Sequence, residues 1–238
     1  MMRFLLLITL IVCGFFSCKK DKAADAPDLG YDYYPTQKGR FVIYNCDSIV
    51  HYDVTFDTDT FVFQIKEIID STLTDNSGRP LYRISRYKKL QKINDSLIVN
   101  PYWAIQDVWW ATKTSTTVEV VEENYRFVKL IFPTIKDKVW NGNAQNNLGS
   151  QDYTYTEVDE PATFGTLTFQ KSLSVDQSSS LTSILSLKKY SEKYARGVGL
   201  IYKELKDYTW KQNFSGVLIG QIKEGLYYKM TIESFGVQ

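Results

Sequence analysis

The sequence predicts an all-β, mostly antiparallel domain with little helix, folded as a β-barrel or a β-sandwich. Apolar and polar residues alternate with a period of two in several segments, which is typical of strands with one buried face. Clusters of Gly, Asn, Asp and Ser separate these segments, as hairpin turns do. Aromatic residues make up 15% of the chain, with 17 tyrosines, and aromatic side chains favour strands. About ten to twelve strands without alternating helices argue against an α/β fold.

The individual strands follow from the alternating segments in chain order. Residues 103–113, rich in tryptophan, are predicted as a strand, with a short helix as the alternative, and residues 181–194 fit either structure. Turns are expected at residues 57–59, 75–78 and 94–96. The other predicted strands cover residues 41–46, 50–56, 60–69, 81–90, 116–122, 125–132, 153–158, 166–175, 198–208 and 226–235.

The first residues of the chain have the pattern of a secretory signal. Arg3 precedes an apolar run over residues 4–16, which is too short for a transmembrane helix of roughly 20 residues. The run ends at Ser17-Cys18, which resembles a lipobox, the motif in which a small residue precedes a cysteine that is acylated. Cys13 is the rival position, but a valine precedes it. A plain signal peptide with an incidental Cys18 is the alternative.

This pattern divides the chain into three parts. Residues 1–17 are predicted as the signal peptide, 18–32 as a lipidated flexible tether and 33–238 as one β-rich domain. Bacterial lipoproteins carry two or three acyl chains, and two or more chains anchor a protein stably. The expected partner is therefore a lipid bilayer, reached through acylated Cys18.

Composition excludes several classes of function. Loss of residues 1–17 removes Arg3 alone among the charged residues, so the 28 basic residues fall to 27 against 27 acidic ones. A net charge near zero without a basic stripe argues against nucleic-acid binding. Cys46 is then the one cysteine left, and it is predicted to be a small buried residue. With a single histidine, His51, the sequence offers no catalytic constellation, no metal site and no cofactor motif.

The irregular stretch at residues 133–151 is the predicted place for ligand binding. Loops of this length are usually functional or disordered. Trp140, expected to be exposed, could stack on a sugar or a peptide while Asn141 and Asn143 fix its orientation. The alternative is a long turn in which the asparagines serve only turn geometry.

Two segments carry a family resemblance. They are Tyr33-Tyr34-Pro35, followed by Gly39 and Tyr44, and the stretch at residues 192–204, EKYARGVGLIYKE. With the lipobox, they resemble small Bacteroidetes lipoproteins. The resemblance implies an outer-membrane lipoprotein that faces the periplasm or the cell surface, and it brings no activity with it.

The leading hypothesis is a non-enzymatic, lipid-anchored envelope module that binds a protein, glycan or lipid ligand. A structural or accessory subunit of an envelope complex is the alternative. An enzyme is the third class, and the sequence supplies no residues for it.

Acylation of Cys18 is directly testable. Mass spectrometry of the mature protein should find a lipid-modified Cys18 at the N-terminus, because the small Ser17 precedes it. Cys18→Ala should leave the precursor unprocessed or release the protein from the membrane, while Cys13→Ala should change neither. An unmodified N-terminus at another residue would contradict the anchor.

Overall fold

The computed structural model describes residues 27–238 apart from 56, 100 and 179–182, and it is all-β. The fold class predicted from the sequence is confirmed. In this described part, thirteen antiparallel strands form one sheet, no segment is α-helical, and η2 (Tyr31–Tyr33) is a single 3-10 turn. The strands are β1 (Arg40–His51), β2 (Thr58–Thr74), β3 (Pro80–Ile93), β4 (Ser96–Leu97), β5 (Ala104–Lys113), β6 (Thr117–Glu122), β7 (Tyr125–Ile131), β8 (Val139–Asn141), β9 (Asp152–Phe164), β10 (Leu167–Asp176), β11 (Ser186–Ala195), β12 (Gly199–Asn213) and β13 (Gly216–Val237).

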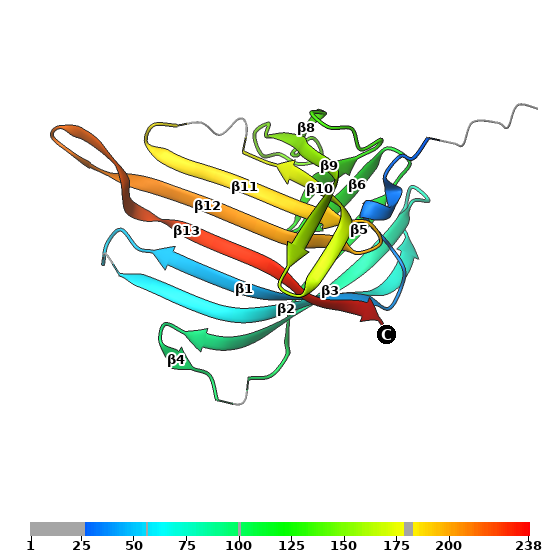
Figure 1. Cartoon of the computed structure of the whole chain (residues 1–238), viewed down its shortest axis with the longest axis horizontal. Helices are drawn as coiled ribbons and strands as arrows, with labels where there is room; N and C mark the ends of the chain where they lie inside the picture. Colours follow the sequence, from blue (N-terminus) through cyan, green and yellow to red (C-terminus); the bar gives the residue numbers. More distant parts are fainter. Residues whose placement is uncertain (1–26, 56, 100, 179–182) are drawn as a thin grey trace, which may run out of the picture.

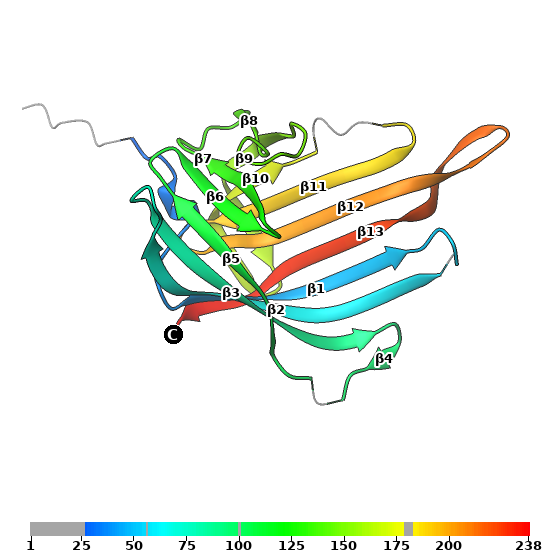
Figure 2. The ribbon, with the colours of Figure 1, turned by 180° about the vertical axis from the view of Figure 1, so that it is seen from behind.

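The sheet curls into a nearly closed barrel (Figures 1 and 2). Its strand order is β7-β6-β5-β3-β2-β1-β13-β12-β11-β10-β9-β8, with β4 paired to β3. The chain thus starts in the middle of the sheet, and its last strand returns beside its first. The two ends of the sheet meet where the Val128 N–H of β7 donates to the carbonyl oxygen of Gly142, at 2.8 Å. The indole N–H of Trp140 donates back to the Val128 oxygen, also at 2.8 Å.

The N-terminal segment closes one end of the barrel. The Tyr33 side chain is fully buried there, and its hydroxyl donates to Asp159 at 2.6 Å. The Arg196 guanidinium pairs with Asp159, Asp32 and Asp28 at 2.7 to 2.8 Å. We call residues 27–35 the plug. The long β12–β13 hairpin protrudes at the opposite end of the barrel (Figure 1).

Aromatic and aliphatic side chains fill the barrel near the plug and also cover part of its outside. One buried cluster joins Tyr33 to β5, β6, β7 and β9, and another joins β1 and β2 to β13. The β9–β10 hairpin lies across the outside of the sheet. Its Phe164 ring stacks on Tyr202, and Phe169 contacts Phe235 at 6.1 Å between ring centroids.

The strand expectations hold with a few corrections. The strand predicted at residues 103–113 is confirmed as β5, which begins one residue later, at Ala104. β11 resolves the ambiguous region as a strand from Ser186 onward, while residues 181–182 lie outside the described part. The separate strand predicted at residues 50–56 is wrong: residues 50–51 are the end of β1, residues 52–55 are not in a strand, and residue 56 lies outside the described part. β1 runs unbroken to His51 and then turns, with the Tyr52 N–H donating to the Asp57 oxygen. The alternation of apolar and polar residues continues past the end of β1 into the turn, so the pattern predicted a strand there.

The boundary of the expected tether also moves. Residues 28–32 were expected to belong to a flexible tether, but Asp28 and Asp32 pair with Arg196, and Lys113 donates to the Tyr31 oxygen at 2.6 Å. The packed structure therefore includes the last five residues of that segment. Residues 18–26 and the predicted signal peptide lie outside the described part.

Cys46 faces the barrel interior and is buried at 1% exposure. Burial raises the pKa of its thiol to about 12. We expect native protein to react with Ellman's reagent far more slowly than urea-unfolded protein, because the thiolate is the reactive form. Equal labelling rates before and after unfolding would contradict this burial.

Candidate functional site

The candidate site is a cavity of about 450 Å³ inside the barrel. It is bounded at its deep end by Tyr34 of the plug and opens toward the β12–β13 hairpin, where Leu205 and Leu226 line it. Proteins usually contain few voids larger than a water molecule. A cavity of this size is therefore unusual, and it is the candidate binding site of this protein.

One side of the cavity is apolar. Phe63 and Ile65 of β2 lie beside Tyr228 and Met230 of β13, and Leu205 of β12 continues the surface. These positions alternate along their strands, so the period-two pattern of the sequence directs them inward. The Tyr228 hydroxyl donates to the Met230 sulfur at 3.4 Å and to the Cys46 sulfur at 3.7 Å. The wall therefore exposes aromatic rings and aliphatic groups to the cavity, and the Tyr228 hydroxyl already has hydrogen-bond partners within the wall.

The facing side carries a buried ionic cluster. The Lys129 ammonium of β7 lies 2.6 Å from Glu192 of β11 and 3.3 Å from Glu122 of β6. Lys203 of β12 approaches the same two carboxylates at 3.3 and 3.7 Å. The Tyr194 hydroxyl donates to the second Glu192 oxygen at 2.6 Å. We call Glu122, Lys129, Glu192 and Lys203 the ionic quartet.

Opposite charges favour the ionised forms of Glu122, Lys129 and Glu192. Burial alone raises the pKa of the Glu192 carboxyl, but the Lys129 and Lys203 ammonium groups outweigh burial and hold it below its usual value. The pKa of Glu122 is lowered by the same balance. Burial lowers the pKa of Lys129, but Glu122 and Glu192 more than compensate and raise it overall. Two cations and two anions thus satisfy one another.

Arg86 of β3 forms a second ion-pair group in the cavity. Its guanidinium lies 2.8 Å from Glu67 and 3.3 Å from Asp107, and it stacks 3.6 Å from the ring centroid of Trp109. The indole N–H of Trp109 is buried, and within the described residues it has no hydrogen-bond partner. Buried polar groups without a partner are uncommon in native structures.

Lys88 and Gln106 line the cavity nearer its mouth. The Lys88 ammonium sits 4.1 Å from the centre of the Phe63 ring. No carboxylate of the described chain forms an ion pair with it. Lys88 and Gln106 also line an adjoining apolar hollow of about 470 Å³. The other residues that line this hollow are Leu90, Ile98, Val99, Pro101, Tyr102, Ala104 and Ile105.

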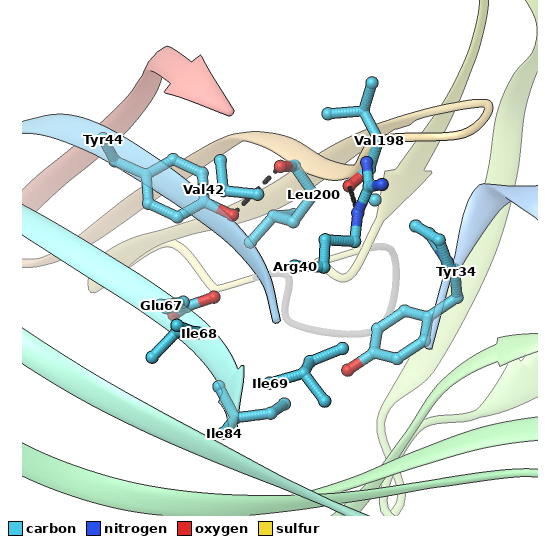
Figure 3. Close-up of a pocket in the computed structure, with 12 residues that line it drawn as sticks. Tyr34, Arg40, Val42, Tyr44, Glu67, Ile68, Ile69, Ile84, Val198 and Leu200 are labelled. Carbon is cyan, nitrogen blue, oxygen red and sulfur yellow. Dashed lines mark hydrogen bonds between the residues drawn. The ribbon is translucent and has the colours of Figure 1, made fainter. Parts of the chain in front are cut away.

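The deep end of the interior contains a smaller hollow of about 70 Å³ (Figure 3). Tyr34, Glu67 and Ile84 line both this hollow and the main cavity. The Tyr44 hydroxyl donates to the Leu200 oxygen there at 3.0 Å, and burial raises the pKa of the Tyr34 hydroxyl. This end has room for little more than water.

The expected exposure of Trp140 is wrong. Its ring is only 9% exposed and lies against Tyr153 and Tyr155, because its indole helps to close the barrel at β7. Asn141 accepts from the N–H groups of Asn143 and Gln151, and the Asn143 amide donates to the Gly149 oxygen. The amides therefore serve local turn geometry. Ligand binding by Trp140, Asn141 and Asn143 stays an untested prediction, without the exposed ring on which it depended.

The single histidine is not part of the cavity lining. His51 ends β1, where its Nδ1 is 3.2 Å from the Thr58 hydroxyl. In the described ranges, no three His, Cys, Asp or Glu side chains gather as metal ligands would. Across the same residues, no helix has the length and hydropathy needed to span a bilayer.

Sequence reasoning missed the cavity residues. Arg86 and Lys88 were visible as charges within a predicted strand, and an inward charge at a period-two position is a detectable signal. The quartet gave no such signal, because Lys129 and Glu192 are 63 residues apart. Only the curvature of the sheet brings them together.

Comparisons with known proteins give little further information. No protein-family model matches the sequence. No curated protein matches it either. A solved structure from Parabacteroides distasonis ATCC 8503, named a "putative lipoprotein", aligns with 86% of this chain and 98% of its own, at 12% sequence identity and a TM-score of 0.31. A TM-score this low identifies neither a shared fold nor a shared function.

Removing one member of the ionic quartet should be strongly destabilising, because it leaves a buried charge without compensation. Glu192→Gln keeps the side-chain shape but leaves two buried ammonium groups facing one carboxylate, so we expect it to lower the free energy of unfolding by about 3–5 kcal/mol. The folded pKa of Glu192 lies below its usual 4.5, so wild-type stability should fall as pH drops below 4.5, and less so in the variant.

Urea unfolding followed by tryptophan fluorescence at pH 7 and at pH 3 measures both effects. Glu157→Gln is the matched control, since Glu157 pairs with Lys193 on the surface at 2.8 Å and its side chain is 48% exposed. Such a pair contributes about 0–1 kcal/mol. Equal losses in the two variants would show that the quartet is not a special constraint.

Proposed function

We propose that this protein is a lipid-anchored cell-envelope protein whose barrel holds a small, partly apolar ligand in its interior. The observation that carries the proposal is the cavity of about 450 Å³ with one apolar wall, closed by the plug at one end. Ligand pockets typically measure about 300–1,000 Å³ and are lined mainly by apolar and aromatic side chains. The size and lining of this cavity fall within that description.

The wall is also stable enough to act as a preformed pocket. Its residues lie on long paired strands, with Ile65 opposite Tyr44 of β1 and Met230 opposite Cys46. Sites on strands are more rigid than sites on loops. A ligand would then bind without first ordering the wall, which lowers the entropic cost of binding.

The lipid anchor rests on Ser17-Cys18 and on the apolar run before it. From Cys18 to Pro27, the first described residue, is nine residue steps, or at most about 32 Å of extended chain. Pro27 belongs to the plug, at the end of the barrel away from the cavity mouth. Acylation of Cys18 would therefore tether the closed end of the barrel to the bilayer.

A structural or accessory subunit of an envelope complex is the second candidate. The observation that favours it is a group of exposed apolar side chains beside β4 and β5, formed by Leu97, Val99, Tyr102 and Ile105. Val99 is 84% exposed and Ile105 62%. Exposed apolar patches often mark sites of protein contact.

Ligand binding is tested with a neutral apolar fluorophore, N-phenyl-1-naphthylamine. Wild-type protein should enhance its fluorescence saturably. Leu226→Trp fills the mouth of the cavity and should weaken binding at least about tenfold, since overpacking removes the space that the probe needs. Ile219→Trp, on the same strand but 71% exposed, is the control and should bind as wild type does. Unchanged binding by folded Leu226→Trp protein would place the probe elsewhere.

A further inference from the structure

The cavity has unused capacity of one kind only, which is the capacity to donate hydrogen bonds and to carry positive charge. We propose that its ligand is an anionic amphipath, an apolar chain ending in a carboxylate or a phosphate, whose acidic group pairs with Lys88. This inference rests on the proposed function and adds the chemical class of the ligand.

The carboxylates facing the cavity are already neutralised. Glu67 pairs with Arg86 at 2.8 Å, and Asp107, which is not itself part of the lining, pairs with Arg86 at 3.3 Å. Glu122 and Glu192 pair with the two lysines of the quartet. Glu123 also reaches the lining, but its side chain is exposed to solvent at the β6–β7 turn. Among the described residues, every buried carboxylate that lines the cavity therefore already has a cationic partner.

Lys88 is the cation that remains without an acidic partner. It is half-buried, and its ammonium lies 4.1 Å from the centre of the Phe63 ring, on the apolar wall. A cation over an aromatic ring is only partly compensated for lost hydration. An acidic group placed there would gain a charge-assisted hydrogen bond in a partly desolvated site.

The buried indole N–H of Trp109 is a second unused donor in the same lining. Trp109 pairs with Ile84 across β3 and β5, whereas Lys88 pairs with Ala104, so the two donors lie at different depths. The Lys88 ammonium and the Trp109 indole N–H can each donate a hydrogen bond, so each favours a ligand atom that accepts one. This second observation is independent of the charge count and points the same way.

The chain of the amphipath belongs in the interior cavity rather than in the adjoining hollow. The inner wall includes Phe63, over which Lys88 lies, and Leu205, both on long paired strands. The hollow is lined by Val99 and Tyr102, which are mostly exposed to solvent. A chain gains more by leaving water for the inner wall, because apolar burial scales with the area removed from solvent.

The test displaces N-phenyl-1-naphthylamine from the full mature protein at pH 8 with four ligands of equal chain length: dodecanoate, dodecyl phosphate, dodecanol and dodecylamine. We expect at least one of the two anions to bind about tenfold more tightly than the alcohol, which corresponds to one charge-assisted hydrogen bond. The stronger of the two identifies the acid. The amine should bind no better than the alcohol.

Variants of Lys88 assign the preference to this residue. Lys88→Met keeps an apolar side chain over Phe63 and should bring the affinity for both anions down to that for dodecanol. Lys88→Arg should restore the preference. Lys89→Met is the matched control, because Lys89 is the next residue on β3 and lies over Trp103 instead, and it should behave as wild type.

Three outcomes would overturn the inference: equal affinity for anions and alcohol, preference for the amine, or an anion preference that survives in Lys88→Met. Binding of the neutral probe without any charge preference would leave the proposed function standing and remove only this inference. Failure of the probe to bind at all would remove the proposed function itself.

Discussion

The ionic quartet is the constraint on which the rest of the barrel depends. Glu122 and Lys129 lie on β6 and β7, near one end of the strand order, while Glu192 and Lys203 lie on β11 and β12, toward the other. Their pairing therefore crosses the interior and ties opposite walls together. Apolar side chains alone could close this distance by collapse, but paired charges fix the separation and orientation at which both are satisfied. Desolvating four charges costs free energy, so the gain is specificity of shape more than stability.

The interior of the barrel is filled with side chains at the plug end and contains the cavity beyond them. On the plug side, Tyr33, Leu130 and Tyr155 are fully buried and fill the interior. Beyond these side chains lies the cavity, which the quartet lines together with the apolar wall. The β12–β13 hairpin protrudes at the end of the barrel opposite the plug (Figure 1). At Gly225 of this hairpin, φ is +143°, and a Cβ atom would lie 2.1 Å from the Asp207 oxygen. Glycine thus permits the close approach of β12 and β13 beside the mouth.

Local patterns predicted the strands well and the site poorly, for one physical reason. Alternation depends on neighbouring residues, so it located residues 60–69 and 81–90 within β2 and β3. It failed at residues 50–56, where alternating residues continue past the end of β1 into a turn. Trp140 looked like a loop residue because Asn and Gly follow it, yet its indole bonds Val128 at the closure of the barrel. The closure of the barrel and the lining of the cavity depend on contacts between residues that are distant in sequence, and a local sequence pattern cannot predict such contacts.

The plug and the cavity mouth lie at opposite ends of the barrel. Arg196 holds Asp28 and Asp32 at the plug, so the chain leaves the fold there toward Cys18. The proposed ligand would enter at the other end, between Lys88 and Leu226. The plug is tied down by ion pairs and by the buried Tyr33, so opening it would expose a fully buried ring and several charges at once. Exchange through the mouth requires no such loss. If Cys18 carries the proposed anchor, the proposed ligand would enter and leave on the side of the domain that faces away from the bilayer.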